Sequence, residues 1–218
     1  MQSDQAKYRG EFTKEDIVSA SPRHDSDQLY VGGADIMRYS VERLRYLPYD
    51  QYLPRIKRPR FPALFCSPKV MIGYTSGGLY DDGVSFSQTD ARRWLFCNHN
   101  VLLAVPWRFL SAVSNRSIAS GLRHAARILG GKRHRDELEK ASDGYSVAAL
   151  AALCLSRAVS AYTVCNLRRS EMSLTEDQLK AIPIRRIHFT TPDKERTALV
   201  EGLKGMYREW VGRREERV

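Results

Sequence analysis

The sequence contains no apolar run long enough to form a membrane-spanning helix. Its longest run, over residues 147–155, has nine residues before Ser156 interrupts it, whereas a membrane span needs roughly twenty. The opening residues, MQSDQAKYRGEF, are polar and do not resemble a secretory signal peptide. We therefore expect a soluble, cytoplasmic protein without a membrane partner.

Paired cysteines are also missing. The chain has 4 cysteines, none of which forms a CxxC pair, and Cys97 with His99 is too small a set for a zinc site. The 5 histidines are scattered along the chain. We expect free thiols, a reducing compartment and no bound metal.

The short motifs of enzymes that modify nucleic acids are absent as well. None of the 9 prolines is adjacent to another or precedes a cysteine, so the catalytic loops of DNA-base methyltransferases are missing. No two of the 14 glycines have the GxG spacing of a dinucleotide or adenosyl loop. No acidic residue stands two positions before a lysine, as in the core of many metal-dependent nucleases. We expect a chain that is not an enzyme on its own and holds no cofactor, with a diverged nuclease as an alternative.

Acidic residues are scarce in the middle of the chain. Residues 51–135 contain fourteen Lys or Arg but only three acidic residues, while the segments on either side are nearly neutral. The excess of basic residues, +10 for the whole chain, therefore sits in one segment. Such a concentrated positive field attracts polyanions. Nucleic acid is favoured over an anionic membrane, because the segment has no amphipathic basic helix with bulky aromatics. A solvated basic surface without a partner is the alternative.

Periodicity predicts strands in the first half of the chain and helices in the second. We expect strands over 69–75, 84–89 and 100–107, a turn at 81–83, and a helix capped by Asp35. We expect helices over 117–129, 146–164 and from Pro192 onward. This order indicates an α+β fold with a mixed, mainly antiparallel sheet followed by a helical half.

Three parts of the chain differ in character. Residues 1–28 form a polar lead-in, 29–189 the main domain, and 190–218 an amphipathic C-terminal helix. One face of that helix is a candidate surface for binding a partner, and packing against its own domain is an equal alternative. The face consists of Leu199, Leu203, Met206, Tyr207 and Trp210.

Clusters of cationic and small polar residues are candidate DNA contacts. Arg and Lys bind phosphates, the Arg fork can also grip a guanine edge, and Asn or Ser can read other edges or brace the backbone. The candidates are Arg55, Lys57, Arg58 and Arg60; Lys69; Asn115, Arg116 and Ser117; Arg123, Arg127, Lys132, Arg133 and Arg135; and Arg168, Arg169 and Ser170. A solvated surface explains any one of these residues, but their clustering favours polyanion binding.

The run RRSEMSLTEDQLKAIPI at 168–184 resembles the closing signature of the TaqI-like target recognition domain. In that family an Arg-Arg-Ser segment leads through a polar stretch into a short helix that ends in Leu-Pro-Ile-Pro. Other elements of the family pattern follow in order over 29–189: LYVGGADIMRY at 29–39, FCSPKVMIGYT at 65–75, LYDDGVSF at 79–86, VPW at 105–107, NRSI at 115–118 and LAALCLSRAVSAY at 150–162. Glu171, Thr175-Glu176 and Arg185 depart from the pattern.

The resemblance implies a fold like that of a target recognition domain and a role in choosing DNA sequences. Such domains give specificity to type IIG restriction-modification enzymes and to adenine-specific DNA methyltransferases. They normally follow a methyltransferase domain, which this sequence lacks. A methyltransferase or nuclease partner would then carry S-adenosylmethionine and Mg²⁺ and act on the duplex DNA. The alternatives are an RNA-binding or nucleoprotein scaffold protein, or an inactive remnant of a methyltransferase.

Overall fold

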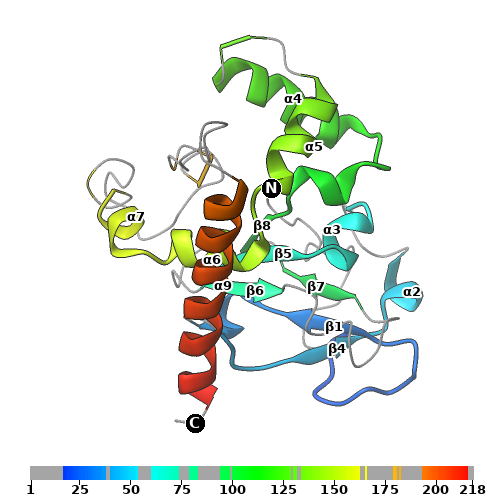
Figure 1. Ribbon diagram of the computed structural model, residues 1–218. Coiled ribbons are helices and arrows are strands. Elements are labelled where there is room, and N and C mark those ends of the chain that lie inside the picture. The colour runs from blue at the N-terminus through cyan, green and yellow to red at the C-terminus, as the bar shows by residue number, and fades with distance from the viewer. Residues whose placement is uncertain are drawn as a thin grey trace.

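The computed structural model describes residues 17–37, 40–53, 60–73, 79–82, 94–98, 100–128, 130–131, 134–162, 165, 179–180, 182 and 193–215. Within these ranges every strand lies before residue 105 and every helix longer than four residues begins after residue 115. The protein therefore has the mixed α+β composition that the sequence predicts, with strands in the first half and helices in the second (Figure 1).

The described strands form three small sheets. In the first, β1 (Gln28–Val31) pairs antiparallel with β4 (Arg45–Leu47) and parallel with β7 (Leu95–Cys97). In the second, β5 (Lys69–Gly73) lies between β6 (Leu79–Asp82) and β8 (Val101–Ala104), antiparallel to both. The third is the antiparallel pair β2 (Ile36–Met37) and β3 (Ser40–Val41). The predicted mixture with mainly antiparallel pairing is confirmed.

The strand predictions succeed at β5 and fail in part elsewhere. The strand predicted over 100–107 is shorter, because proline cannot donate a ladder hydrogen bond. Strand β8 ends at Ala104, and Pro106 leads into the 3-10 turn η3 (Trp107–Leu110). The turn predicted at 81–83 is wrong at Asp81 and Asp82, which pair with β5 in an edge strand, where charged residues are common. The strand predicted over 84–89 lies outside the described residues.

Asp35 does not cap an α-helix, so that prediction is wrong. It closes the short 3-10 turn η1 (Gly33–Asp35), and β2 follows immediately. The described part of the first half also contains the short helices α2 (Tyr49–Tyr52) and α3 (Ala63–Cys66).

The apolar core consists of two clusters that share strand β5. Met71 faces the first cluster, with β1 and β7, while Val70 and Ile72 face the second. This follows from the alternation of side chains along a strand, and all five residues of β5 are buried. The first cluster also contains Ile17 and Val18. The core therefore begins upstream of residue 29, and residues 17 and 18 are not part of a loosely held polar lead-in.

Helices cover the second cluster. Helix α6 (Val147–Cys154) lies on β5, and α9 (Asp193–Glu215) packs against α6, as Figure 1 shows. The predicted helix over 146–164 is wrong in one respect, because the chain forms α6 and then a separate helix, α7 (Arg157–Tyr162). The hydroxyl of Ser156 accepts a hydrogen bond of 3.2 Å from the Val159 amide and so caps α7. No helix in the described part of the chain is long and apolar enough to span a membrane.

Helices α4 (Arg116–Ile128) and α5 (Arg135–Asp143) lie at the end of the molecule opposite β1 and β4 (Figure 1). Gly130 has a φ of 69°, and the Gly131 amide donates to the Ala126 carbonyl over 3.0 Å. This left-handed residue ends α4 where the sequence predicts.

All four cysteines are free, and they should differ widely in reactivity. Burial raises the pKa of Cys154 to about 11 from 9.0, which lowers its thiolate fraction at pH 8 by roughly a hundredfold. We expect iodoacetamide to label the exposed Cys66 and Cys165 first. The labelling rate of Cys154 should rise with pH until the pH exceeds the pKa of its thiol. Peptide mass spectrometry after timed labelling measures the rates. Rapid labelling of Cys154 at pH 8 would contradict its burial.

Candidate nucleic-acid interface

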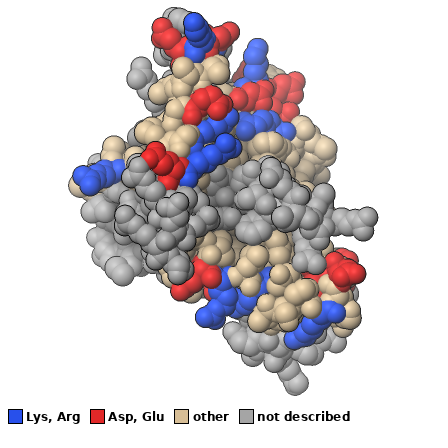
Figure 2. Space-filling view, turned by 60° about the horizontal axis from the view of Figure 1, so that its bottom comes forward, with Lys and Arg blue, Asp and Glu red and all other residues tan. Residues whose placement is uncertain are grey.

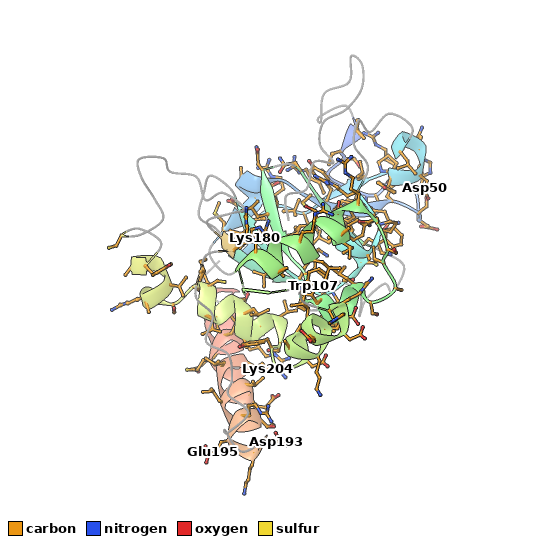
Figure 3. The ribbon with its side chains drawn as sticks, turned by 90° about the horizontal axis from the view of Figure 1, so that it is seen from above. Asp50, Trp107, Lys180, Asp193, Glu195 and Lys204 are labelled. Atoms are coloured by element: carbon orange, nitrogen blue, oxygen red, sulfur yellow. The ribbon has the colours of Figure 1, made fainter. Side chains whose placement is uncertain are left out.

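A cleft of about 760 Å³ lies beside helix α4. One wall is formed by α4 and the other by residues of β8, η3 and α3 together with Arg60 and Lys180. Figure 3 looks down on this end of the molecule and labels Trp107 and Lys180 in its central region. The volume of the cleft falls within the range of small-molecule sites, and its mouth is open to larger ligands.

The lining of this cleft is strongly cationic. Among its described lining residues four carry a full positive charge and none is acidic; the four are Arg60, Arg123, Arg127 and Lys180. A concave surface of one charge sign concentrates the field and attracts anions. Figure 2, turned toward the lower end of Figure 1, shows Lys and Arg interspersed with Asp and Glu among the described residues of that face.

The turn that leads into helix α4 is held by two arginines that link α5 to η3. The guanidinium of Arg135 donates to the carbonyls of Leu110 and Val113 and to the Glu139 carboxylate. Arg108 donates to the Ser142 carbonyl at the other end of α5 and lies over the Phe109 ring at 4.5 Å. Burial lowers the pKa of Arg108, partly offset by the charge of Asp143. The turn that leads into α4 is thus fixed from both ends of α5.

The wall opposite α4 approaches the helix closely at one glycine. A Cβ atom at Gly121 would lie 3.3 Å from Cη2 of Trp107, closer than an ordinary contact. The half-buried indole of Trp107 can pack directly on α4 because residue 121 has no side chain. This contact fixes Trp107 as a wall of the cleft.

Four of the predicted DNA contacts meet in this cleft: Arg60, Ser117, Arg123 and Arg127. Arg116 lies in an adjoining hollow. The Oδ1 atom of Asn115 accepts hydrogen bonds from the amides of Ser117 (2.9 Å) and Ile118 (3.1 Å), so it caps α4 and is not available to read a base. Eight further candidates lie outside the described residues: Arg55, Lys57, Arg58, Lys132, Arg133, Arg168, Arg169 and Ser170.

Two of the predicted DNA contacts have side chains that are used inside the protein. The Lys69 prediction is wrong, whereas three donors of the Arg135 guanidinium serve the acceptors described above and its DNA contact stays a prediction. Lys69 is fully buried, and its Nζ donates to the carbonyls of Phe65 (2.7 Å) and Ser67 (3.3 Å) at the end of α3. A buried ammonium that satisfies helix-end carbonyls stabilises the fold and cannot reach a phosphate.

Replacing Lys69 by Met should therefore affect stability and not DNA binding. Met fills the site but leaves two buried carbonyls without their donor, so we expect the free energy of unfolding to fall by about 1–3 kcal/mol. Urea denaturation measures this change, and a DNA titration with the same folded variant should show unaltered affinity. A stable variant with weakened DNA binding would restore Lys69 as a contact.

The predicted partner-binding face of α9 is only partly available. The prediction of Tyr207 as a docking residue is wrong, since its side chain is buried in the second cluster at 4% exposure. Leu203 is half-buried, whereas Leu199 and Met206 are 56% and 48% exposed. The side chain of Trp210 lies outside the description. Docking at Leu199 and Met206 stays a prediction.

Among the cleft residues that the predicted set lacks are Trp107, His124 and Lys180. The Arg127 guanidinium donates to Nδ1 of His124 over 3.1 Å, and because arginine cannot accept, His124 must accept there. The spacing of Ser117, Gly121 and His124 along α4 was a usable signal, since residues three or four apart share a helix face. Lys180 comes from a distant segment, and no local pattern connects it to α4.

No group of three His, Cys, Asp or Glu suited to a metal ion occurs among the residues that the structure describes. No family model, curated protein or solved structure matches the chain. The resemblance to a target recognition domain therefore stays a prediction, and the function has to be argued from the cleft.

Proposed function

We propose that this protein binds duplex DNA through the cleft beside α4 and serves as the specificity module for a separate adenine-N6 methyltransferase or methyltransferase-nuclease subunit. The observation that carries the proposal is the lining of the cleft: Arg60, Arg123, Arg127 and Lys180 line a concave surface on which the described residues include no carboxylate. Phosphates are the ligands that such a set favours most.

The arrangement on α4 suits a repeating polyanion better than a single small anion. Arg123 and Arg127 are both exposed and lie one turn apart, about 6 Å along the helix axis. They can therefore grip successive phosphates, while Arg60 and Lys180 approach from the other wall. Phosphate contacts of this kind fix the position of a protein on DNA, and base contacts then supply specificity.

The resemblance of residues 29–189 to a target recognition domain supports the choice of duplex DNA and of a catalytic partner. In this proposal the partner supplies S-adenosylmethionine, Mg²⁺ and the chemistry, because the chain has none of the required motifs. The exposed Leu199 and Met206, seven residues apart on one face of α9, are the proposed contact with that partner.

A salt titration tests the DNA-binding proposal directly. Fluorescence anisotropy with a labelled duplex should give a plot of log affinity against log salt with a slope near −3 to −4, since each phosphate contact contributes about −0.9. A flat salt response would contradict the proposal. Competition with structured RNA provides the second measurement, because RNA that displaces the duplex at lower concentration would favour an RNA-binding protein instead.

A further inference from the structure

A second hollow, of about 690 Å³, adjoins the basic cleft. Arg60 and Ser117 line both of them. The walls of the second hollow are different in kind, because three of its residues are aromatic: Tyr49, Phe61 and Trp94. An aromatic hollow joined to a cationic cleft is the feature that needs an explanation.

The aromatic walls are held rigidly by the core. The Tyr49 ring stacks on Phe96 with centroids 4.2 Å apart, and Phe96 stacks in turn on Phe65 at 4.5 Å. The Trp94 ring lies 6.1 Å from Phe96. The Trp94 amide also donates to Oε1 of Gln28 over 2.6 Å, which ties the residue to β1. Phe61 and Trp94 remain only half-buried, so their faces are presented to the hollow without rearrangement.

The rim of the hollow adds charge to these aromatic faces. Arg60 and the exposed Arg116 lie at the rim, and Asp50, labelled in Figure 3, lies on α2. The Oδ1 atom of Asn115 is committed to capping α4, which leaves its NH₂ group as a donor. A flat ring next to an anionic group, with a donor and an acceptor for its edge, is the chemistry of a nucleotide.

We propose that this hollow binds one unstacked nucleobase of the DNA, with the base against Trp94 and Phe61 and its flanking phosphates on Arg60 and Arg116. The inference rests on the proposed DNA-binding function, which it extends. Removing a base from the duplex stack costs a few kcal/mol, and stacking on aromatic side chains returns part of that cost. A base that is already unpaired should therefore bind best.

Three duplexes of otherwise identical sequence test the inference with the full chain: one fully paired, one with a single bulged adenosine, and one with an abasic residue in the same bulge. We expect the bulged adenosine to improve affinity about tenfold over the paired duplex, and the abasic bulge to lose most of that gain. The two bulges have the same backbone and the same charge, so the difference between them reports what the base itself contributes.

Two variants locate the effect. Trp94→Ala should abolish the preference for the base-bearing bulge and leave affinity for the paired duplex within about twofold, because the phosphate contacts persist. If Trp94→Ala lowers stability, Phe61→Ser repeats the measurement at a residue that lies in no strand.

The outcomes separate the two claims. No binding to any duplex would overturn the proposed function itself. Equal affinity for the two bulges, or a preference that both variants retain, would overturn the hollow as a base site while DNA binding stands. Displacement of the bulged duplex by micromolar adenosine monophosphate would replace the DNA base with a free nucleotide as the ligand.

Discussion

Replacing both Arg123 and Arg127 by glutamate should weaken binding to duplex DNA by about a hundredfold at moderate salt. Each side chain loses a charge-assisted hydrogen bond worth about 1.5 kcal/mol or more, and 1.4 kcal/mol corresponds to a factor of ten. The salt slope should fall by about two, one for each phosphate contact. Both side chains are exposed on α4, so the variant should fold, which circular dichroism checks.

A matched control carries the same change in net charge on α9. Lys194 and Arg208 are both exposed, and neither lines the cleft. Replacing both by glutamate should lower affinity less than about fivefold, because distant charges act only through a field that salt screens. Equal losses in the two variants would show that binding follows net charge and does not depend on the cleft.

The helices could be predicted from the sequence more fully than the strands. Helices α4 and α9 show local periodicity, and the end of α4 is marked by Gly130. Strands β1 and β7 have three or four residues each and pair across the chain, with Leu29 opposite Leu95. No local pattern fixes such a distant partner, so their pairing depends on burial in the core that the whole chain forms.

The candidate cleft could be predicted most directly where charge and exposure coincide. Arg123 and Arg127 are basic, exposed and on one helix, so their sequence clustering was informative. Lys69 and Arg135 are equally basic, but each is directed to backbone carbonyls inside the protein. Composition does not distinguish a basic residue that faces solvent from one that satisfies buried acceptors. Trp107 was missed for a related reason, since its role depends on contact with Gly121.

A buried ion pair connects the turn at η1 to strand β4. Oδ2 of Asp35 accepts a hydrogen bond of 2.7 Å from the Gly32 amide and also binds the Arg45 guanidinium. The Asp35 and Arg45 side chains are only 11% and 17% exposed. Arg45 also lies over the Tyr30 ring, 5.5 Å from its centroid. The pair therefore holds β4 and the 3-10 turn against β1, whose Leu29, Tyr30 and Val31 belong to the first core cluster.

Replacing Asp35 by Ala should lower the free energy of unfolding by about 3–5 kcal/mol, because the Arg45 charge is left buried without its partner. Urea denaturation measures the loss, and Asp25→Ala, at an exposed aspartate, should change stability by less than about 0.5 kcal/mol. The double variant Asp35→Ala with Arg45→Met also removes the Arg45 charge that has lost its partner. It should be destabilised by at least about 1 kcal/mol less than the sum of the two single variants. Additive losses would mean that Asp35 acts through its hydrogen bond to Gly32 alone and that the ion pair contributes nothing of its own.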